Sequence, residues 1–541
     1  MLISKTRTLT FLPALAACSC LLLTSCRPDS YDAAGDYVGP ERTMAAKKAL
    51  PPPPAVVVPE SGPLEISVLE AVLIALDRNR ALAVRKLAPA LSRTSVQAER
   101  AAFEPKLSAE VDRTRTVTEK DSSTTGTRQR SVSDGAGGSA GADVFLPTGT
   151  TVELSVDTDL TDSSAYSDEQ ADTRAGLSVT QSLLRGFGLK VNLASLRQAR
   201  LDVLSSQFEL RGYSETLVAD VEKTCWEYAL AGREIEIVTN SLKLAEQQLS
   251  ETSERVKVGK LAETEMAAAQ AEVAGRREEL IDARSTLAKK RLTLIRLMSL
   301  GRKTNWDREV RLKHKPAIPK VKLTPVTEHV GVALRCRPDL NQARLDIRTG
   351  RLEVVKTRNG LLPKLDLFIN MGTTGYASSF GQSLDGDTGD GYDTRVGLRF
   401  ELPLGNGAAR ARHGRALLRL EEARRALSNM SQLVELDVRT AYIEVQRTRE
   451  QITATAATRK AKEEALRAET AKFKVGKSTA FLVAQSQRDF LQSEIAEVRA
   501  LVGYLKALVD LHRLEGSLLE RRGIKAPGAA GLPAPGPGRP D

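Results

Sequence analysis

Few residues of this chain have the types and spacing that chemistry requires. The 541 residues include four histidines that are isolated from one another, without metal-ligand spacing: His314, His329, His413 and His512. Gly476-Lys477-Ser478 matches the end of a phosphate-binding loop, but Ala471 stands where that motif requires a glycine. Gly405-Asn406-Gly407 lacks the third glycine of a dinucleotide-binding turn. The sequence therefore predicts no enzyme, no metal site and no cofactor.

Cys26 is the cysteine with a predicted chemical role. Lys5 and Arg7 precede an apolar run over residues 9–23, a pattern typical of an export signal and too short for a confident membrane span. The following Leu23-Thr24-Ser25-Cys26 resembles a bacterial lipobox, which implies cleavage before Cys26 and lipid attached to its thiol. Cys18 ends a similar motif, although cleavage there would leave an apolar mature N-terminus.

Two further cysteines, Cys225 and Cys336, remain in the mature chain, 111 positions apart (336 − 225) in different predicted helices. An exported protein could pair them, but the sequence favours two buried, unpaired thiols. Arg27 follows Cys26, in place of the Asp that retains lipoproteins in the inner membrane of enteric bacteria. An outer-membrane location is therefore favoured.

The composition favours long paired helices over several globular domains. Hydrophobic residues make up 41% of the chain and aromatic residues only 4%, which is too few for several thick cores. Charged residues make up 27%, which excludes a polytopic helical membrane protein. The net charge of +11 comes from basic residues that alternate with acidic ones along predicted helices. We interpret it as a solvated surface and predict no nucleic-acid partner.

The chain is a tandem duplication. A shift of 258 residues (333 − 75) places Ala75-Leu76 on Ala333-Leu334 and Leu82 on Leu340. Further along, a shift of 217 places Val258-Gly259-Lys260 on Val475-Gly476-Lys477. The shift decreases because the first copy holds about 40 extra residues (258 − 217). The extra segment, at about 120–160, could be a larger external loop or an added hairpin that alters the strand count.

Each copy has the same predicted order of elements. The expected elements are a helix (67–103 and 325–361), a strand region of period two (106–184 and 364–402), a long helix ending near Val258 or Val475, and a returning helix. Apolar residues follow an unbroken 3-4 spacing from Val218 to Val256, which predicts a left-handed coiled coil. The helix over 190–257 would rise roughly 100 Å at 1.5 Å per residue, so its partners must be similar helices.

Several segments carry a resemblance to one family. Residues 181–188 and 402–407 resemble its strand-to-helix junctions, 65–71 the start of its first helix, and 255–259 and 473–476 its two helix-tip turns. Together with the duplication, these segments resemble the TolC family of outer-membrane efflux proteins over about residues 64–520. The resemblance implies a mainly α fold with a membrane β-barrel. Four strands per chain would form one 12-stranded barrel in a homotrimer, above a coiled-coil helical barrel.

The same resemblance implies a channel component of a tripartite efflux or type I secretion system. The trimer would cross the periplasm and outer membrane, contact outer-membrane lipid, and passively export substrates delivered by a periplasmic adaptor and an inner-membrane pump. The alternative is a periplasmic coiled-coil lipoprotein that acts as a scaffold or adaptor. The predicted adaptor-docking residues lie at the two helix tips: Val258, Gly259, Lys260, Leu261, Val475, Gly476 and Lys477.

The closed end of the channel has candidate residues of its own. Family members often place Asp six and nine residues after the second tip glycine, where this chain has Leu482 and Gln485. The aperture is therefore either apolar, gated by dewetting, or elsewhere. The expected organisation is a signal peptide (1–26), a Pro-rich tether (27–63), repeat 1 (64–300), an equatorial linker (301–324), repeat 2 (325–520) and a disordered Pro/Gly tail (521–541).

Overall fold

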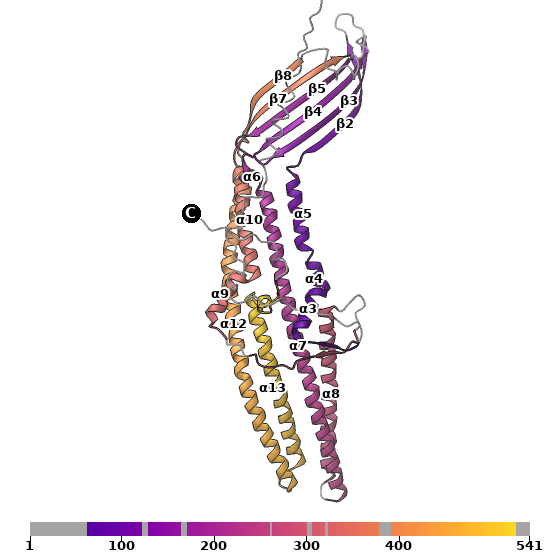
Figure 1. Cartoon of the computed structure of the whole chain (residues 1–541), viewed down its shortest axis with the longest axis vertical. Coiled ribbons are helices and arrows are strands. Elements are labelled where there is room, and N and C mark those ends of the chain that lie inside the picture. Colours follow the sequence, from indigo (N-terminus) through magenta and orange to yellow (C-terminus); the bar gives the residue numbers. More distant parts are fainter. Residues whose placement is uncertain are drawn as a thin grey trace, which may run out of the picture. The chain divides into compact units, whose positions relative to one another are not determined.

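The computed structural model describes residues 62–121, 128–163, 170–259, 262–299, 306–319, 323–377 and 391–525, all within one compact unit. Long helices and one large sheet make up this unit (Figure 1). Cys26, the tether up to residue 61, Lys260 and Leu261 lie outside the described residues. Within the described ranges, none of the helices combines the length and apolarity needed to span a bilayer.

The first helix of each repeat is divided, whereas the sequence predicted one continuous helix. Repeat 1 has α3 (Val68–Arg78), α4 (Arg80–Arg85) and α5 (Ala88–Ala101). Repeat 2 has α9 (Val326–Cys336) and α10 (Pro338–Asn359). Asn79 is extended and caps α4 through Leu82 N, at 2.9 Å. Arg337 is extended because Pro338 follows it. The breaks at Asn79 and at Arg337 therefore have local causes.

The long helices match the predicted ones closely. In repeat 1 a short α6 (Leu189–Asn192) leads into α7 (Ala194–Lys257), and α8 (Glu263–Met298) returns. In repeat 2, α12 (Gly407–Lys474) is followed by α13 (Ala480–Leu514) and a short α14 (Leu518–Arg521). Helices α7 and α8 pack together, as do α12 and α13, and α13 also contacts α7. The heptad prediction is confirmed, since Val218, Val221 and Val238 are all buried.

The sheet differs from the prediction in its number of strands. The described residues form one antiparallel six-stranded sheet of order β2-β3-β4-β5-β7-β8. Its strands are β2 (Lys106–Asp121), β3 (Arg128–Leu146), β4 (Thr150–Ser163), β5 (Gln170–Ser182), β7 (Lys364–Ala377) and β8 (Gly391–Glu401). Repeat 2 supplies the expected two strands, but repeat 1 supplies four. The predicted four strands per chain is therefore wrong, because the extra segment forms the hairpin β3–β4 within the sheet.

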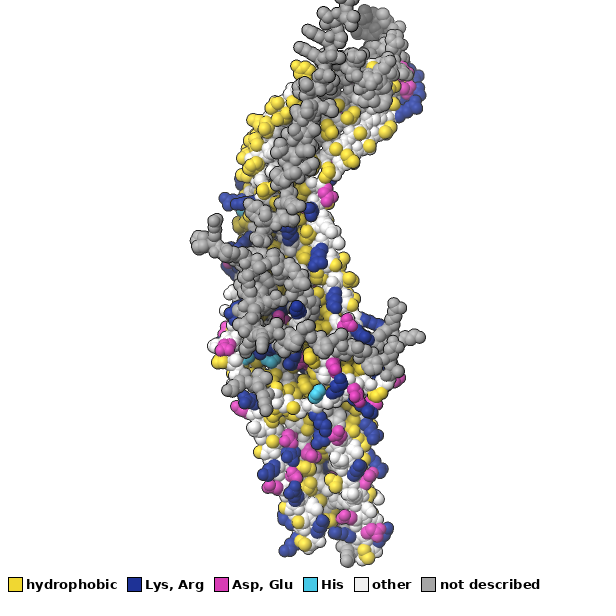
Figure 2. All heavy atoms as spheres, in the orientation of Figure 1, with side chains coloured by type: hydrophobic (Ala, Val, Ile, Leu, Met, Phe, Trp, Pro, Cys, Tyr) yellow, Lys and Arg dark blue, Asp and Glu magenta, His cyan; other side chains and the backbone are white. Residues whose placement is uncertain are grey.

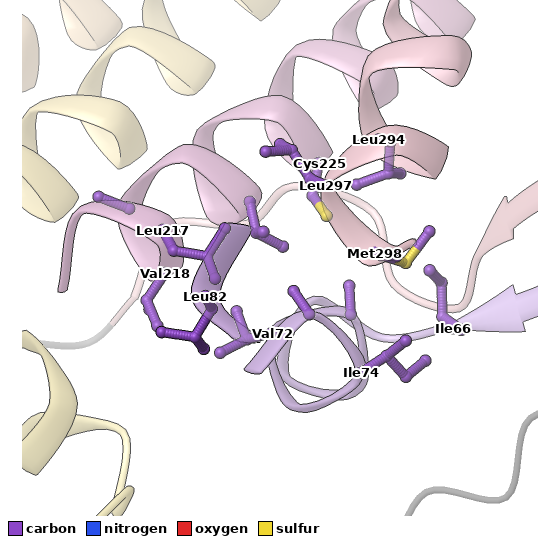
Figure 3. Packing of buried hydrophobic residues seen from close by; sticks show 14 of the residues in the cluster. Ile66, Val72, Ile74, Leu82, Leu217, Val218, Cys225, Leu294, Leu297 and Met298 are labelled. Carbon is purple, nitrogen blue, oxygen red and sulfur yellow. The ribbon is translucent and has the colours of Figure 1, made fainter. Parts of the chain in front are cut away.

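The main hydrophobic core joins the beginning of repeat 1 to the middle of α7 and the end of α8. Side chains from α3, α7 and α8 meet there, with Leu294, Ile295 and Met298 fully buried (Figure 3). A parallel strand pair lies beside it, with β1 (Leu64–Ile66) paired to β6 (Val310–Leu312). A second core in repeat 2 includes Leu340 and Leu511. Cys225 and Cys336 are buried and unpaired, as predicted.

Candidate functional site

The tip of repeat 1 is a tight turn between α7 and α8. Val258 ends α7 by donating its N–H to the Glu254 carbonyl, and its side chain is 70% exposed. Gly259 follows at φ +73°, in the left-handed region that favours glycine. The predicted glycine-ended helix is therefore observed here, and Val258 and Gly259 are accessible.

The tip of repeat 2 repeats this geometry and exposes apolar side chains. Val475 is 70% exposed and Gly476 has φ +75°, while Lys477 is exposed beside them. Thr479 caps α13, and Phe481 and Leu482 are exposed in its first turn. An apolar surface on a solvated turn is suited to burial against a partner.

Charged groups hold the second tip in shape. Glu469 accepts hydrogen bonds from Ser478 and, at 3.0 Å, from the Lys472 ammonium. The hydrogen bonds from Ser478 and Lys472 lower the pKa of Glu469. The guanidinium of Arg255 lies 5.2 Å from the ring centroid of the buried Phe473, which connects the two tips.

The two aperture candidates both lie on α13 close to the tip. Leu482 is 43% exposed, and Gln485 is also exposed. They are three positions apart along the helix (i and i+3), so they are neighbours on one helix face. A buried Val483 packs with Phe473 and Ala480 on another face. The exposed pair is thus available to face a lumen or a neighbouring copy.

The six-stranded sheet has one apolar face and one polar face. Its pairing aligns apolar side chains across five of the six strands, from β2 to β7, and Leu107 and Val111 at the β2 edge are 88% and 89% exposed. From Leu107 this row continues through Ala142, Leu154, Leu177 and Met371 to Thr394, and Phe400 lies on the same face of β8. The other face carries Asp112, Asp157, Arg174, Asn370 and Arg395. Figure 2 shows hydrophobic side chains gathered over the sheet, while charges of both signs mix along the helices.

A band of buried charged residues lies on α7 and was missed by sequence analysis. Arg211 contacts Glu215 at 3.2 Å and Glu520 at 2.5 Å, and Arg522 contacts Glu222 at 2.6 Å. Burial raises the pKa of Glu215 to about 8, with Arg211 opposing the shift.

The partners in this band come from the chain's C-terminal segment. The predicted disordered tail began at residue 521, but Arg522 is ion-paired and Ile524 is buried in the main core. The apolar Leu518-Leu519, both fully buried, was the available signal that this segment packs.

The chain belongs to the outer membrane efflux protein family. The family model matches residues 72–300 and 330–517. This result confirms the predicted family and its architecture of long helices with a strand sheet. Members of the family are transport conduits and not enzymes. No curated protein gives a significant match.

Solved structures with the same fold include outer membrane channels. The CmeC outer membrane channel of Campylobacter jejuni is 14% identical with a TM-score of 0.63, covering 87% of this chain and 98% of its own. The outer membrane protein VceC of Vibrio cholerae is 17% identical with a TM-score of 0.62, covering 83% and 96%. The open MtrE outer membrane channel of Neisseria gonorrhoeae is 18% identical with a TM-score of 0.59, covering 86% and 94%.

Proposed function

We propose that this chain is the outer-membrane channel of a tripartite efflux or type I secretion system. Three copies would form a continuous conduit, and substrates delivered by an inner-membrane pump and a periplasmic adaptor would pass through it without chemistry. The observation that best supports this proposal is the two-faced sheet, whose outer edges at β2 and β8 are unpaired among the described strands. An apolar face suits lipid and a polar face suits a lumen, but unpaired edges are costly in a bilayer.

Oligomerisation follows from the same feature. Six strands are fewer than the eight of the smallest common barrels, so one chain cannot close its sheet alone. The helices agree, since Leu433, Leu436 and Ile443 are apolar residues of α12 that the described part of the chain leaves exposed. A closed cyclic assembly of identical copies would bury both surfaces.

The ends of the molecule receive separate roles in this proposal. The helix tips, with Val258, Gly259, Val475, Gly476 and Lys477, would dock the hairpins of an adaptor. Lys260 and Leu261 would complete the first tip, and Leu482 and Gln485 would border the periplasmic aperture. Residues 1–26 would be removed as a signal peptide, and lipid on Cys26 would anchor the tether in the outer membrane.

The test is conductance together with oligomeric state. Purified full-length protein should run as a heat-resistant trimer in detergent and conduct ions across planar lipid bilayers. A water-soluble monomer without conductance would instead support the alternative of a periplasmic scaffold or adaptor lipoprotein.

A further inference from the structure

The hairpin β3–β4 separates two strands that would otherwise be neighbours. β2 pairs with β3 from Lys106↔Asp143 to Asp121↔Arg128, and β4 pairs with β5 from Thr150↔Gln181 to Thr161↔Gln170. Between them, β3 and β4 pair from Leu146↔Thr150 to Ser133↔Ser163. An external loop would leave β2 beside β5. The extra segment therefore belongs to the wall of the sheet.

The hairpin also keeps the two-faced character of the sheet. Ala142 of β3 lies in one row with Leu107 of β2 and Leu154 of β4. The row on the opposite face contains Asp143 and Glu153, which pair directly. Since a shift of one residue would reverse the faces, this alignment suits a hairpin exposed to lipid on one side and to a polar lumen on the other.

The turn of the hairpin is built into the strand-to-helix junction. Asn192 at the end of α6 donates to the Pro147 carbonyl at 3.0 Å, and Gly188 N–H donates to the Thr148 carbonyl at 3.1 Å. Gly149 has φ +91°, and a Cβ there would lie 2.3 Å from the Gly186 carbonyl oxygen. Such close packing fixes the hairpin at the point where the sheet meets the helices.

The two outer edges of the sheet are complementary. The chain enters β2 from α5 and leaves β8 toward α12, so the edges run in opposite directions and can pair antiparallel between copies. On the polar face, the β2 edge carries Glu110 and Asp112 whereas the β8 edge carries Arg395 and Arg399. Opposite charges on facing edges favour pairing with a second copy of this chain.

We infer that three copies of this chain close an 18-stranded barrel through β2–β8 pairing, in place of the 12 strands that four per chain would give. The inference rests on the proposed trimeric channel and specifies its pore. The resulting pore would admit larger substrates at its sheet end.

The register within the sheet is consistent with closure. The row of paired residues that starts at Lys106, the first residue of β2, reaches Arg395 on β8. Glu401, the last residue of β8, lies six residues further toward the helices, and pairing the helix-proximal ends of the two edge strands places the next copy's Lys106 opposite Glu401. A stagger of six residues over six strands corresponds to a strand tilt of about 35°, which lies within the range of membrane barrels.

The strand number sets the width of the pore. With neighbouring strands about 4.8 Å apart and tilted by about 35°, 12 strands give a backbone diameter of about 22 Å and 18 strands about 34 Å. The cross-section enclosed by the backbone is then a little more than doubled, in proportion to the square of the strand number.

Cross-linking tests which strands meet. In the full chain, Lys106→Cys combined with Glu401→Cys should give covalent dimers and trimers on non-reducing gels, since facing strands bring Cα atoms within disulfide reach. Arg399→Cys, one step along the same face, should cross-link less. The matched control combines Glu401→Cys with Thr151→Cys, on the same polar face and at the same end of β4, and should stay monomeric. Each single variant reports the background from the buried Cys225 and Cys336.

A deletion tests the width. Replacing residues 119–169 by Asn-Gly removes the hairpin and leaves Thr118 opposite Gln170, both on the polar face, across a two-residue turn. The diameter of the largest polyethylene glycol that enters from the sheet end and lowers the conductance should be about one third smaller for this variant than for the full chain. If the variant does not fold, the cross-linking result still decides.

The outcomes separate the two proposals. Conducting trimers that cross-link through Thr151→Cys but not Lys106→Cys, or a deletion with an unchanged size limit, would overturn the 18-stranded barrel and leave the channel intact. A conducting dimer, which would contain 12 strands, would overturn it as well. Protein that neither conducts nor oligomerises would overturn the proposed function itself.

Discussion

The two repeats have nearly equal helices and unequal sheets. Helices α7 and α12 have 64 and 68 residues, and α8 and α13 have 36 and 35. Repeat 1 nevertheless contributes four strands and repeat 2 only two. Each long helix packs against the returning helix of its own repeat, α7 against α8 and α12 against α13, so a change in the length of one helix would leave part of its partner uncovered. A sheet tolerates an added hairpin, because each strand contacts only its two neighbours.

The repeats also differ in what covers their long helices. The C-terminal segment, with α14 and Ile524, packs on α7 of repeat 1 and pairs with its charged residues. The shift of 217 places Gln432 of α12 on Glu215, and Gln432 is exposed. The same position is thus a buried acid in one repeat and a solvated amide in the other.

The largest expected effect tests the similarity of the repeats. Leu82→Ala and Leu340→Ala remove equivalent side chains that are 1% and 0% exposed. Each substitution should lower the free energy of unfolding by about 2–5 kcal/mol, through lost burial and a cavity. Denaturant titration followed by helix circular dichroism in detergent measures both. A cost in one repeat only would show that the two cores are not equivalent.

The next effect tests the difference between the sheets. Gly149 and Gly405 have nearly the same φ, +91° and +90°, but a Cβ is crowded at Gly149 and meets nothing within 4 Å at Gly405. Gly405→Ala should cost about 1–2 kcal/mol from backbone strain alone. Gly149→Ala should cost about 1–3 kcal/mol more, from the clash. The heat resistance of the oligomer reports both, and equal losses would contradict the tight junction of the hairpin.

A third effect concerns the buried acid of repeat 1. The folded-state pKa of Glu215 is raised from 4.5 to about 8. Its contribution to the free energy of unfolding is therefore fully present below about pH 4.5 and is lost as the pH rises toward 8. Glu215→Gln should therefore flatten the decline of the unfolding midpoint over this window. The exposed Glu254→Gln on the same helix is the control and should leave the slope unchanged. If the unfolding midpoint of Glu215→Gln fell more steeply with pH than that of the unmodified protein, the raised pKa of Glu215 would be contradicted.

The smallest effect on stability concerns the tips. Val258→Glu and Val475→Glu change exposed side chains and should alter the free energy of unfolding by less than about 0.5 kcal/mol. Export in cells should nevertheless fall, because a charge opposes burial of the tip against an adaptor.

The two tips should differ in this assay. Val475→Glu should reduce export more, since Phe481 and Leu482 extend the apolar surface around it. Val475→Ala serves as the size control. Undiminished export by both Glu variants, with normal amounts of protein, would remove the tips as docking sites.

Sequence analysis predicted the long helices and both tips because periodic apolar residues and repeated glycines are local signals. It left the hairpin undecided, since β3 contains Gly137, Gly138 and Gly141, which carry little β propensity. The buried band on α7 had no local signal at all. Arg211 and Glu222 are charged residues on a helix, and only the tertiary placement of the C-terminal segment distinguishes them from solvated ones.

The position of the β3–β4 turn limits how such a chain can change during evolution. The turn returns to the end of the sheet from which β2 departed, so every later strand keeps its direction and every later helix starts on its original side. Insertion of a single strand would reverse β5, β7 and β8 and send α7 to the wrong end. Strands can therefore be gained or lost only in pairs.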